Sequence, residues 1–341
     1  DDAYLTTVTL IIPAHNEEYC IENKIRNALE LDYPADKLEI IVASDCSNDN
    51  TVKIAGSIDS RIKVMDYRER GGKMRAVNRT VKIATGEIVV FTDANASYAS
   101  YTIRQLIKHF ADPKVGCVGG AKIIRNHPSA INSTGMGEGK YWKYESSLKT
   151  AESMSGSCVG VDGSVYAVRR EIYPFPPDDI IIMDDLAVSL MLIEKGYECI
   201  FEPNARAFEE SAVKVEDEFF RKSRIFAGAL SLFVAMPKLM FTSIFPKLLS
   251  HKILRWLTFV FQVTFFIASF ALRQEALVRP IFGLQVVFYG CVAAGFILNR
   301  MNIRIPIFHA PYYFTMTTLA QIWGIVHYLR YARQATWERR R

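Results

Sequence analysis

Two uncharged apolar runs in the last third of the chain limit its fold more than any other feature of the sequence. Residues 257–272 read LTFVFQVTFFIASFAL and residues 280–298 read PIFGLQVVFYGCVAAGFIL, with charged side chains only at their flanks. A helix needs about 20 apolar residues to cross the roughly 30 Å of hydrocarbon in a bilayer, and both runs are close to this length. We therefore predict membrane-spanning helices rather than two buried core helices, which are seldom uncharged over such lengths.

The rest of the chain has the charge pattern of a soluble protein. Charged residues are interleaved throughout residues 1–229, so we predict one soluble part there and a membrane region over residues 230–341. The mean hydropathy of +0.08 averages over these two parts. A net charge of +5 is too small to indicate nucleic-acid binding. Six cysteines without a CxxC pair indicate neither a zinc site nor a disulfide framework.

Four segments make up the predicted membrane region. Residues 230–249 contain two lysines and two prolines, which predicts a helix lying in the membrane interface. The spans are expected at about residues 254–272 and 280–298. A third apolar segment, about residues 311–329, is long enough to cross but carries several polar side chains, so it is either interfacial or spanning.

Short β-branched runs alternate with helical patterns in the soluble part. The predicted strands are residues 8–12, 38–43, 62–65 and 87–91. Continuous apolar strands separated by helices are typical of an α/β fold with a parallel sheet covered on both faces. Ligands of such sheets bind beyond the carboxyl ends of the strands, so the residues that follow each strand are the informative ones.

Polar, acid-bearing clusters follow three of these strands. They read PAHNEE after the first strand, SDCSNDNT after the second and TDAN after the fourth. One such cluster is ordinary helix capping. Three clusters at one edge of a sheet favour a shared ligand.

The ordered motifs of the chain resemble a known enzyme family. The segments are VTLIIPAHNEE, SDCSNDNT, GGKMRAVN, FTDAN, MDDL with GYECIFEPNA, and RKSRI. Their set and spacing resemble the inverting glycosyltransferases of family 2, which include cellulose, chitin and hyaluronan synthases and bacterial exopolysaccharide transferases. SHKILRW and TWERRR are similar to segments of the membrane-anchored bacterial members. The resemblance implies a GT-A-like nucleotide-sugar-binding domain with a mostly parallel central sheet.

The resemblance assigns the first motifs to the nucleotide-sugar donor. It implies that Asp45 contacts the nucleoside, commonly uridine, and that Pro13, His15 and Glu17 lie beside the base and ribose. Lys73 opens a predicted helix, where backbone amides, the helix dipole and the ammonium group together favour an anion. The alternatives are a capping aspartate, a loop histidine and a solvated lysine.

Asp93 and Asn95 occupy the position of the family's DxD motif. A sugar diphosphate is strongly anionic beside the bond that breaks, and an oxygen-ligated divalent metal neutralises this charge. Asparagine in place of the second aspartate removes one negative charge from the site but keeps an oxygen ligand. We therefore expect Mg²⁺ or Mn²⁺ at Asp93 and Asn95, with Asp93 also counted in the donor site.

Asp184 and Asp185 stand where the family has its catalytic acidic pair. Inversion needs a base that takes the proton of the acceptor hydroxyl as it attacks the anomeric carbon. We expect Asp185 to be this base, with Asp184 as the second choice. Two acids at a helix start are otherwise explained by capping, because the helix dipole favours them.

Arg221 and Arg224 lie three residues apart on one predicted helix and therefore share a face. They are candidates for holding the diphosphate leaving group; the alternative is surface basic residues near lipid headgroups. Processive members of the family have Gln-x-x-Arg-Trp here, and only the second arginine matches. Whether the enzyme makes a long polymer therefore stays open.

The expected function is transfer of a hexose or aminohexose from a nucleotide sugar to a saccharide or lipid-linked saccharide acceptor in polysaccharide or glycan synthesis. The resemblance implies that the donor is a UDP-sugar. The alternatives are a polyprenyl-phosphate acceptor and an inactive nucleotide-binding membrane protein. A dinucleotide site and a P-loop are not supported, because neither glycine-rich signature is present.

We expect an integral protein of the cell (inner or plasma) membrane with its catalytic domain in the cytosol, where nucleotide sugars are found. Two crossings would return the arginine-rich tail to the cytosol, as the positive-inside rule requires. The lipid bilayer is therefore a partner. The sequence leaves open whether the chain forms a homo-oligomer or needs a further membrane subunit.

Overall fold

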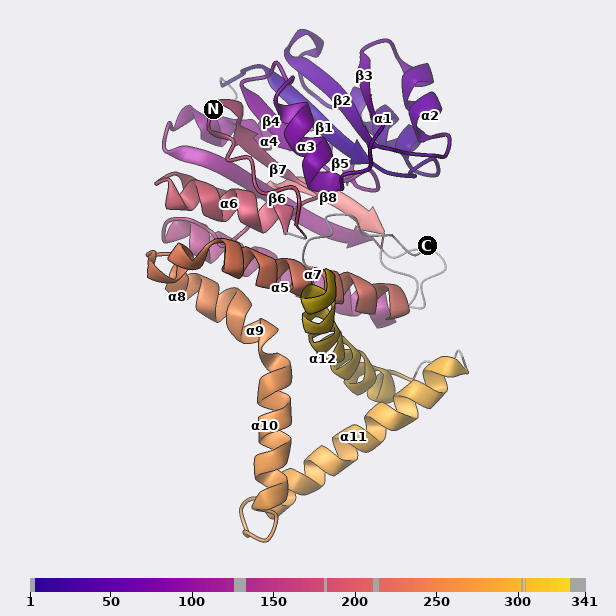
Figure 1. Cartoon of the computed structure of the whole chain (residues 1–341), viewed down its shortest axis with the longest axis vertical. Helices are drawn as coiled ribbons and strands as arrows, with labels where there is room; N and C mark the ends of the chain where they lie inside the picture. The colour runs from indigo at the N-terminus through magenta and orange to yellow at the C-terminus, as the bar shows by residue number, and fades with distance from the viewer. Residues whose placement is uncertain are drawn as a thin grey trace.

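An eight-stranded sheet forms the centre of the soluble part (Figure 1). The structure is a computed structural model that describes residues 4–125, 133–180, 183–210, 215–301, 303 and 305–331. The strand order is β3-β2-β1-β4-β7-β6-β8-β5. The strands are β1 Val8–Ala14, β2 Leu38–Asp45, β3 Ile62–Tyr67, β4 Ile88–Phe91, β5 Ser97–Tyr98, β6 Val115–Arg125, β7 Tyr166–Arg169 and β8 Glu198–Glu210.

The sheet is mostly parallel, as predicted. β1 pairs in parallel with β2 and β4, β2 with β3, and β6 with β8, whereas β7 is antiparallel to β4 and β6 and β5 is antiparallel to β8. The four strands predicted from β-branched runs all form, with ends that differ by a few residues. The parallel pairing brings the carboxyl ends of β1, β2 and β4 to one edge, where the polar clusters lie.

Helices cover both faces of the sheet, because alternate residues of a strand point to opposite sides. Leu10 and Ile12 pack with α1, α2 and α4, whereas Ile11 packs with α3 and α6 on the other face. The helices of the soluble part are α1 Ile21–Leu29, α2 Thr51–Ile58, α3 Lys73–Val81, α4 Thr102–Ile107, α5 Ser133–Met154, α6 Asp184–Glu194 and α7 Val215–Ala235. Short 3₁₀ helices are Ala35–Lys37, Lys108–Ala111, Arg170–Ile172 and Pro237–Phe241.

A third apolar core joins the soluble part to the membrane region. It contains Leu186 and Leu190 of α6, Phe226 of α7, and Leu248 and Trp256 from the segment that follows. Residue 229, where the sequence places the end of the soluble part, lies inside α7. The predicted interfacial segment 230–249 contains the end of α7, a 3₁₀ helix and α8 Phe245–Leu248.

The predicted membrane region forms three long helices in Figure 1. After a π-helical turn at Leu249–Ile253 and α9 Leu254–Trp256, α10 Thr258–Ala271 leads away from the soluble part, α11 Arg279–Arg300 crosses over, and α12 Pro306–Tyr331 returns to α7. Among the described helices, α11 is long and apolar enough to cross a bilayer, with a mean hydropathy of 2.1. The helices Phe245–Trp256 and Thr258–Ala271 meet this criterion only as a pair bent by 60°.

Side-chain hydrogen bonds accompany the bend before α10. The carbonyl oxygen of Arg255 accepts hydrogen bonds from Oγ1 of Thr258 at 2.6 Å and from Nε2 of Gln321 at 3.3 Å. Side chains that bond to a helical carbonyl in this way disturb the backbone ladder and bend the helix. The straight part of the first predicted span is therefore shorter than residues 254–272.

Candidate active site

A cavity of about 740 Å³ opens at the carboxyl ends of the parallel strands and extends to α10 and α12. Every site residue predicted from the sequence lines it: Pro13, His15, Glu17, Asp45, Lys73, Asp93, Asn95, Asp184, Asp185, Arg221 and Arg224. The loops converge because parallel strands end at the same edge. The individual roles of these residues remain predictions.

Asp45 holds the turn that leads into α3. Its Oδ1 accepts a hydrogen bond from the amide of Gly71 and its Oδ2 from the amide of Gly72, both at 2.8 Å. Gly72 has a φ of 87°, a conformation that favours glycine. Nδ1 of His15 lies 2.7 Å from the carbonyl oxygen of Asp45. Asp45 therefore organises the rim of the cavity, and its predicted contact with a nucleoside stays untested.

Lys73 connects the loop after β4 with the start of α6. Its Nζ lies 2.9 Å from Oδ1 of Asp93 and 2.8 Å from Oδ2 of Asp184. Desolvation in the cavity opposes the charge of Lys73, but the carboxylates of Asp184 and Asp93 raise its pKa above the usual lysine range. Desolvation likewise opposes the charge of Asp93, yet Lys73 and Lys122 lower the pKa of Asp93.

Asp185 stands in the first turn of α6 and faces the cavity. Its Oδ2 accepts a hydrogen bond from the amide of Gly163 at 3.0 Å, and its Oδ1 one from the amide of Leu186 at 2.8 Å. Burial, together with the charges of Asp184 and Asp162, raises the pKa of Asp185 to about 6. A carboxylate with a pKa near neutrality is suited to take up a proton at physiological pH.

A buried lysine forms hydrogen bonds with the loop that carries Asp93 and Asn95. Nζ of Lys24 in α1 donates hydrogen bonds to Oγ1 of Thr92 and to the carbonyl of Ala96, both at 2.7 Å. Burial lowers the pKa of Lys24 to about 7. The sequence analysis missed Lys24, because nothing in its helical pattern separates it from a solvated lysine.

The donor atoms at Asp93 and Asn95 fit a divalent metal that shares its ligands with a diphosphate. Both side chains line the cavity and offer oxygen atoms, and Oδ1 of Asp93 is the oxygen bonded to Lys73. Among the described residues, no group of three or more His, Cys, Asp or Glu side chains could hold a metal ion. A metal here would therefore depend on phosphate and water ligands, as Mg²⁺ commonly does.

Arg221 and Arg224 both line the cavity from α7, as their spacing predicts. Nε of Arg221 lies 2.6 Å from Oε2 of the buried Glu218 on the same helix. This contact fixes the guanidinium at the wall of the cavity.

The part of the cavity next to the predicted membrane region, called its membrane-side part below, is strongly charged, which the sequence did not reveal. Among the described residues its basic lining is Lys122, Lys149, Arg221, Lys222, Arg224, Lys252 and Arg255, and its acidic lining is Glu145, Asp162, Glu209 and Glu218. Nζ of Lys122 lies 2.9 Å from Oε2 of Glu209 and 3.6 Å from Oδ1 of Asp162. These side chains come from β6, α5, β8, α7, the loop before β7, the turn Leu249–Ile253 and α9. Only the tertiary structure brings them together.

Comparison with known proteins identifies the domain that carries the strand-end clusters. Residues 9–173 match the sequence model described as glycosyl transferase family 2. The chain carries a glycosyl transferase family 2 domain.

Relatives of this family 2 domain are polysaccharide synthases. The chain is 30% identical over 208 residues to the poly-beta-1,6-N-acetyl-D-glucosamine synthase of Staphylococcus aureus, covering 59% of this chain and 49% of the relative. It is 28% identical over 203 residues to the synthase of the same name from Staphylococcus epidermidis, covering 58% and 48%. The chain thus spans about half the length of the curated relatives it matches.

Solved structures confirm the predicted GT-A-like α/β fold. A mannosyltransferase from Pyrobaculum calidifontis, PcManGT, in complex with GDP-Man and Mn²⁺ superposes with a TM-score of 0.73 at 25% identity, covering 96% of this chain and 88% of that chain. GalNAc-T7 with UDP, GalNAc and Mn²⁺ superposes with a TM-score of 0.51 at 15% identity, covering 68% and 48%. The second likeness concerns the fold alone.

Proposed function

We propose that this protein transfers an aminohexose or hexose, with inversion, from a UDP-sugar to a hydroxyl group of a saccharide or lipid-linked saccharide. The observation that carries the proposal is the single cavity lined by Asp45, Lys73, Asp93 and Asp185. The synthase names of the staphylococcal relatives support an aminohexose. The GDP-mannose bound by the archaeal neighbour makes GDP-mannose the donor to compare with UDP-sugars.

The proposed reaction is a single displacement with Asp185 as the base. A carboxylate oxygen of Asp185 takes the proton of the acceptor hydroxyl. At the same time the hydroxyl oxygen attacks the anomeric carbon, and the bond from that carbon to the nucleoside diphosphate breaks. The amide of Gly163 and the first turn of α6 hold the carboxylate in place. The raised pKa of Asp185 increases its basicity relative to an ordinary aspartate.

The second requirement of the proposed reaction is that the negative charge on the leaving diphosphate is stabilised. Lys73 supplies a cation at the start of α3, next to backbone amides that also favour an anion. Asp93 and Asn95 would hold a Mg²⁺ or Mn²⁺ ion, and such an ion neutralises the developing diphosphate charge when bound. The Mn²⁺ bound by the archaeal mannosyltransferase supports this part of the proposal.

A hydroxyl acceptor is favoured over a polyprenyl phosphate. A phosphate oxygen is already a nucleophile and needs little help from a base, whereas a hydroxyl group must lose its proton. A carboxylate at the cavity wall with a pKa near 6 supports the hydroxyl.

We also propose an integral protein of the cell membrane with a cytosolic catalytic domain, supported by the apolar helix α11.

A donor panel tests the proposal. Membranes that contain the protein are incubated with labelled UDP-GlcNAc, UDP-Glc or GDP-Man and with Mg²⁺ or Mn²⁺, and nucleotide release and labelled product are measured. We expect a UDP-sugar to react fastest and a chelator to stop the reaction. Preference for GDP-Man, or no turnover with any donor, would contradict the proposal.

The variant Asp185→Asn tests the assigned base. We expect transfer to fall at least about a hundredfold, the low end of the range for general base catalysis, while binding of UDP measured by calorimetry stays within about twofold. Near-normal turnover of this variant would favour a phosphate acceptor or another base.

A further inference from the structure

A buried lysine at the membrane-side part of the cavity lacks an anion. Lys149 in α5 is only 3% exposed, and it lines the cavity. Among the described side chains and backbone groups, none forms a hydrogen bond or ion pair with its Nζ; the contact that it makes is with the ring of Phe201, 5.8 Å from the ring centre. An ammonium group that is removed from water without a partner costs several kcal/mol or more, so an anion at Nζ would stabilise it.

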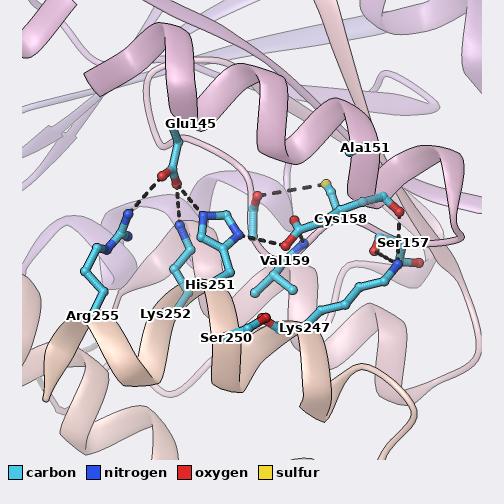
Figure 2. A network of polar contacts seen from close by, with 12 residues as sticks. Glu145, Ala151, Ser157, Cys158, Val159, Lys247, Ser250, His251, Lys252 and Arg255 are labelled. Carbon is cyan, nitrogen blue, oxygen red and sulfur yellow. Dashed lines mark hydrogen bonds and ion pairs between the residues drawn. The ribbon is translucent and has the colours of Figure 1, made fainter. Parts of the chain in front are cut away.

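Glu145, one of the carboxylates whose pKa the charge of Lys149 lowers, is already paired with other cations. Glu145 is 3% exposed, and its oxygens lie 2.5 Å from Nζ of Lys252 and 2.9 Å from Nη1 of Arg255. The ring of His251 lies 3.1 Å from Glu145 and 2.8 Å from Glu152. Figure 2 shows His251, Lys252 and Arg255 gathered around Glu145. Although burial opposes its charge, His251, Lys252, Lys149 and Arg255 together lower the pKa of Glu145 well below the usual range.

Basic side chains outnumber acidic ones among the described residues that line this part of the cavity. Among the described lining residues, seven basic side chains face four acidic ones there. All four acids lie within 4 Å of a basic side chain: Glu145 of Lys252, Glu209 and Asp162 of Lys122, and Glu218 of Arg221. A ligand with one or two negative charges would therefore be attracted to this part of the cavity.

The same cavity connects the catalytic carboxylate with the membrane helices. On one side, although burial opposes the charge of Asp162, Lys122 and then Lys149 lower its pKa, and Asp162 stands next to Gly163, whose amide donates a hydrogen bond to Asp185. On the other side the lining continues with Trp256, Thr258 and Phe314 of α9, α10 and α12. A group held at Lys149 thus lies between the proposed reacting hydroxyl and the apolar helices.

We propose that the membrane-side part of the cavity binds the phosphate or diphosphate group that joins the acceptor saccharide to a lipid. Lys149 contacts the anion, and Lys252 and Arg255 add positive charge around it. The saccharide extends toward Asp185 and the lipid toward α10 and α12. This inference rests on the proposed glycosyl transfer and specifies the class of its acceptor. The diphosphate of the donor belongs to the other end, beside Lys73 and Asp93.

Binding of farnesyl diphosphate, a short lipid diphosphate, tests the site without any turnover. The full chain in detergent is titrated with farnesyl diphosphate, farnesol or inorganic pyrophosphate by calorimetry. We expect farnesyl diphosphate to bind more tightly than both, and Lys149→Gln to weaken it about tenfold or more, the effect of one lost charge-assisted hydrogen bond. Lys53→Gln, at an exposed lysine of α2, is the matched control and should leave binding unchanged.

Two further variants separate binding from folding. Lys149→Arg keeps the charge and should retain most of the affinity, whereas Lys149→Met keeps the length without the charge and should behave like Lys149→Gln. Thermal unfolding of each variant shows whether it is folded. Equal binding of farnesyl diphosphate by Lys149→Met and the wild type, or pyrophosphate binding as tight as that of farnesyl diphosphate, overturns the inference.

Kinetics distinguish an acceptor site from a donor site. The same saccharide is supplied on a lipid diphosphate or as a neutral octyl glycoside, and the KM values of donor and acceptor are measured. We expect Lys149→Gln to raise the KM for the lipid-diphosphate acceptor about tenfold more than the KM for the neutral one. An equal rise in donor KM with both acceptors would assign Lys149 to the donor and overturn the inference. Absence of turnover in the wild type would instead contradict the proposed function, and the binding experiment would still judge the site.

Discussion

Nζ of Lys73 lies 2.8 Å from Oδ2 of Asp184, so the first residue of α3 is bonded to the first residue of α6 across the cavity. The second contact of Lys73, with Asp93, brings the loop after β4 into the same cluster. One cation thus fixes the relative position of the proposed donor-binding and catalytic elements.

Replacing Lys73 by methionine should disrupt donor binding more than folding. The charge-assisted hydrogen bonds of Lys73 are lost and two carboxylates are left without their shared cation, so an incoming diphosphate is repelled. We expect the donor KM to rise about tenfold to a hundredfold. Lys73→Arg keeps the charge and should show a smaller effect. The idea fails if Lys73→Met binds UDP as tightly as the wild type in calorimetry.

The pKa of Asp185 predicts how activity depends on pH. Its value of about 6 in the folded protein lies above the roughly 3.9 of an ordinary aspartate. A base must be deprotonated, so kcat/KM should rise tenfold per pH unit below about pH 6 and level off above it. The measurement is a pH profile between pH 4.5 and 8 in membranes. A flat profile down to pH 5 would mean that another group is the base.

The raised pKa of Asp185 also determines how this residue contributes to stability at different pH values. A carboxyl group whose pKa is raised on folding binds its proton more tightly in the folded state, so its contribution to stability is largest below about pH 4 and decreases as the pH rises to about 6. Activity and this contribution to stability therefore change in opposite directions between pH 4 and 6.

Substitution of Glu145 should strongly destabilise the junction between α5 and the segment before α10. Glu145→Gln leaves Lys252, Arg255 and His251 without their shared carboxylate in a mostly buried place. Breaking a buried ion pair from one side typically costs about 3 kcal/mol or more, although Arg255 is partly exposed and reduces this value. We expect a clear fall in Tm in detergent.

Glu22→Gln is the control for this prediction. Glu22 forms an exposed pair with Arg26 at 2.8 Å on α1, and exposed pairs contribute about 0–1 kcal/mol. Its Tm should match the wild type. Equal effects of Glu145→Gln and Glu22→Gln would show that the buried cluster does not hold the membrane segment on α5.

Gly324 should be required for the close crossing of α12 and α7. A Cβ atom at Gly324 would lie 2.7 Å from the carbonyl oxygen of Ser223 and 3.0 Å from Cβ of Phe226. Gly324→Ala must therefore push the helices apart, at a cost of about 1–3 kcal/mol. At Gly283 in α11 no atom lies within 4 Å of such a Cβ, so Gly283→Ala should be neutral or slightly stabilising. Thermal unfolding of both variants in detergent compares them, and an equal Tm would refute the close contact.

Local patterns in the sequence determined the strands, the edge at which the polar loops meet, and the division between soluble and apolar parts. Each of these depends on residues close together in the chain: β-branched runs form strands, parallel strands end at one edge, and uncharged runs avoid water. For this reason Asp45 and Asp93 could be assigned to one edge of the sheet before the structure was known, whereas the resemblance to family 2 placed Asp185 with them.

Only the tertiary structure decided what surrounds these residues. The bond between Asp45 and the Gly71–Gly72 turn, the lysine beneath the Asp93 loop, and the contact of Glu145 with Arg255 join segments that lie far apart in sequence. A lysine in a helical pattern has the same local sequence signature whether it is solvated or, like Lys149, buried against a cavity. Its environment, and hence its energetic need for an anion, comes from packing and desolvation, which depend on the whole fold.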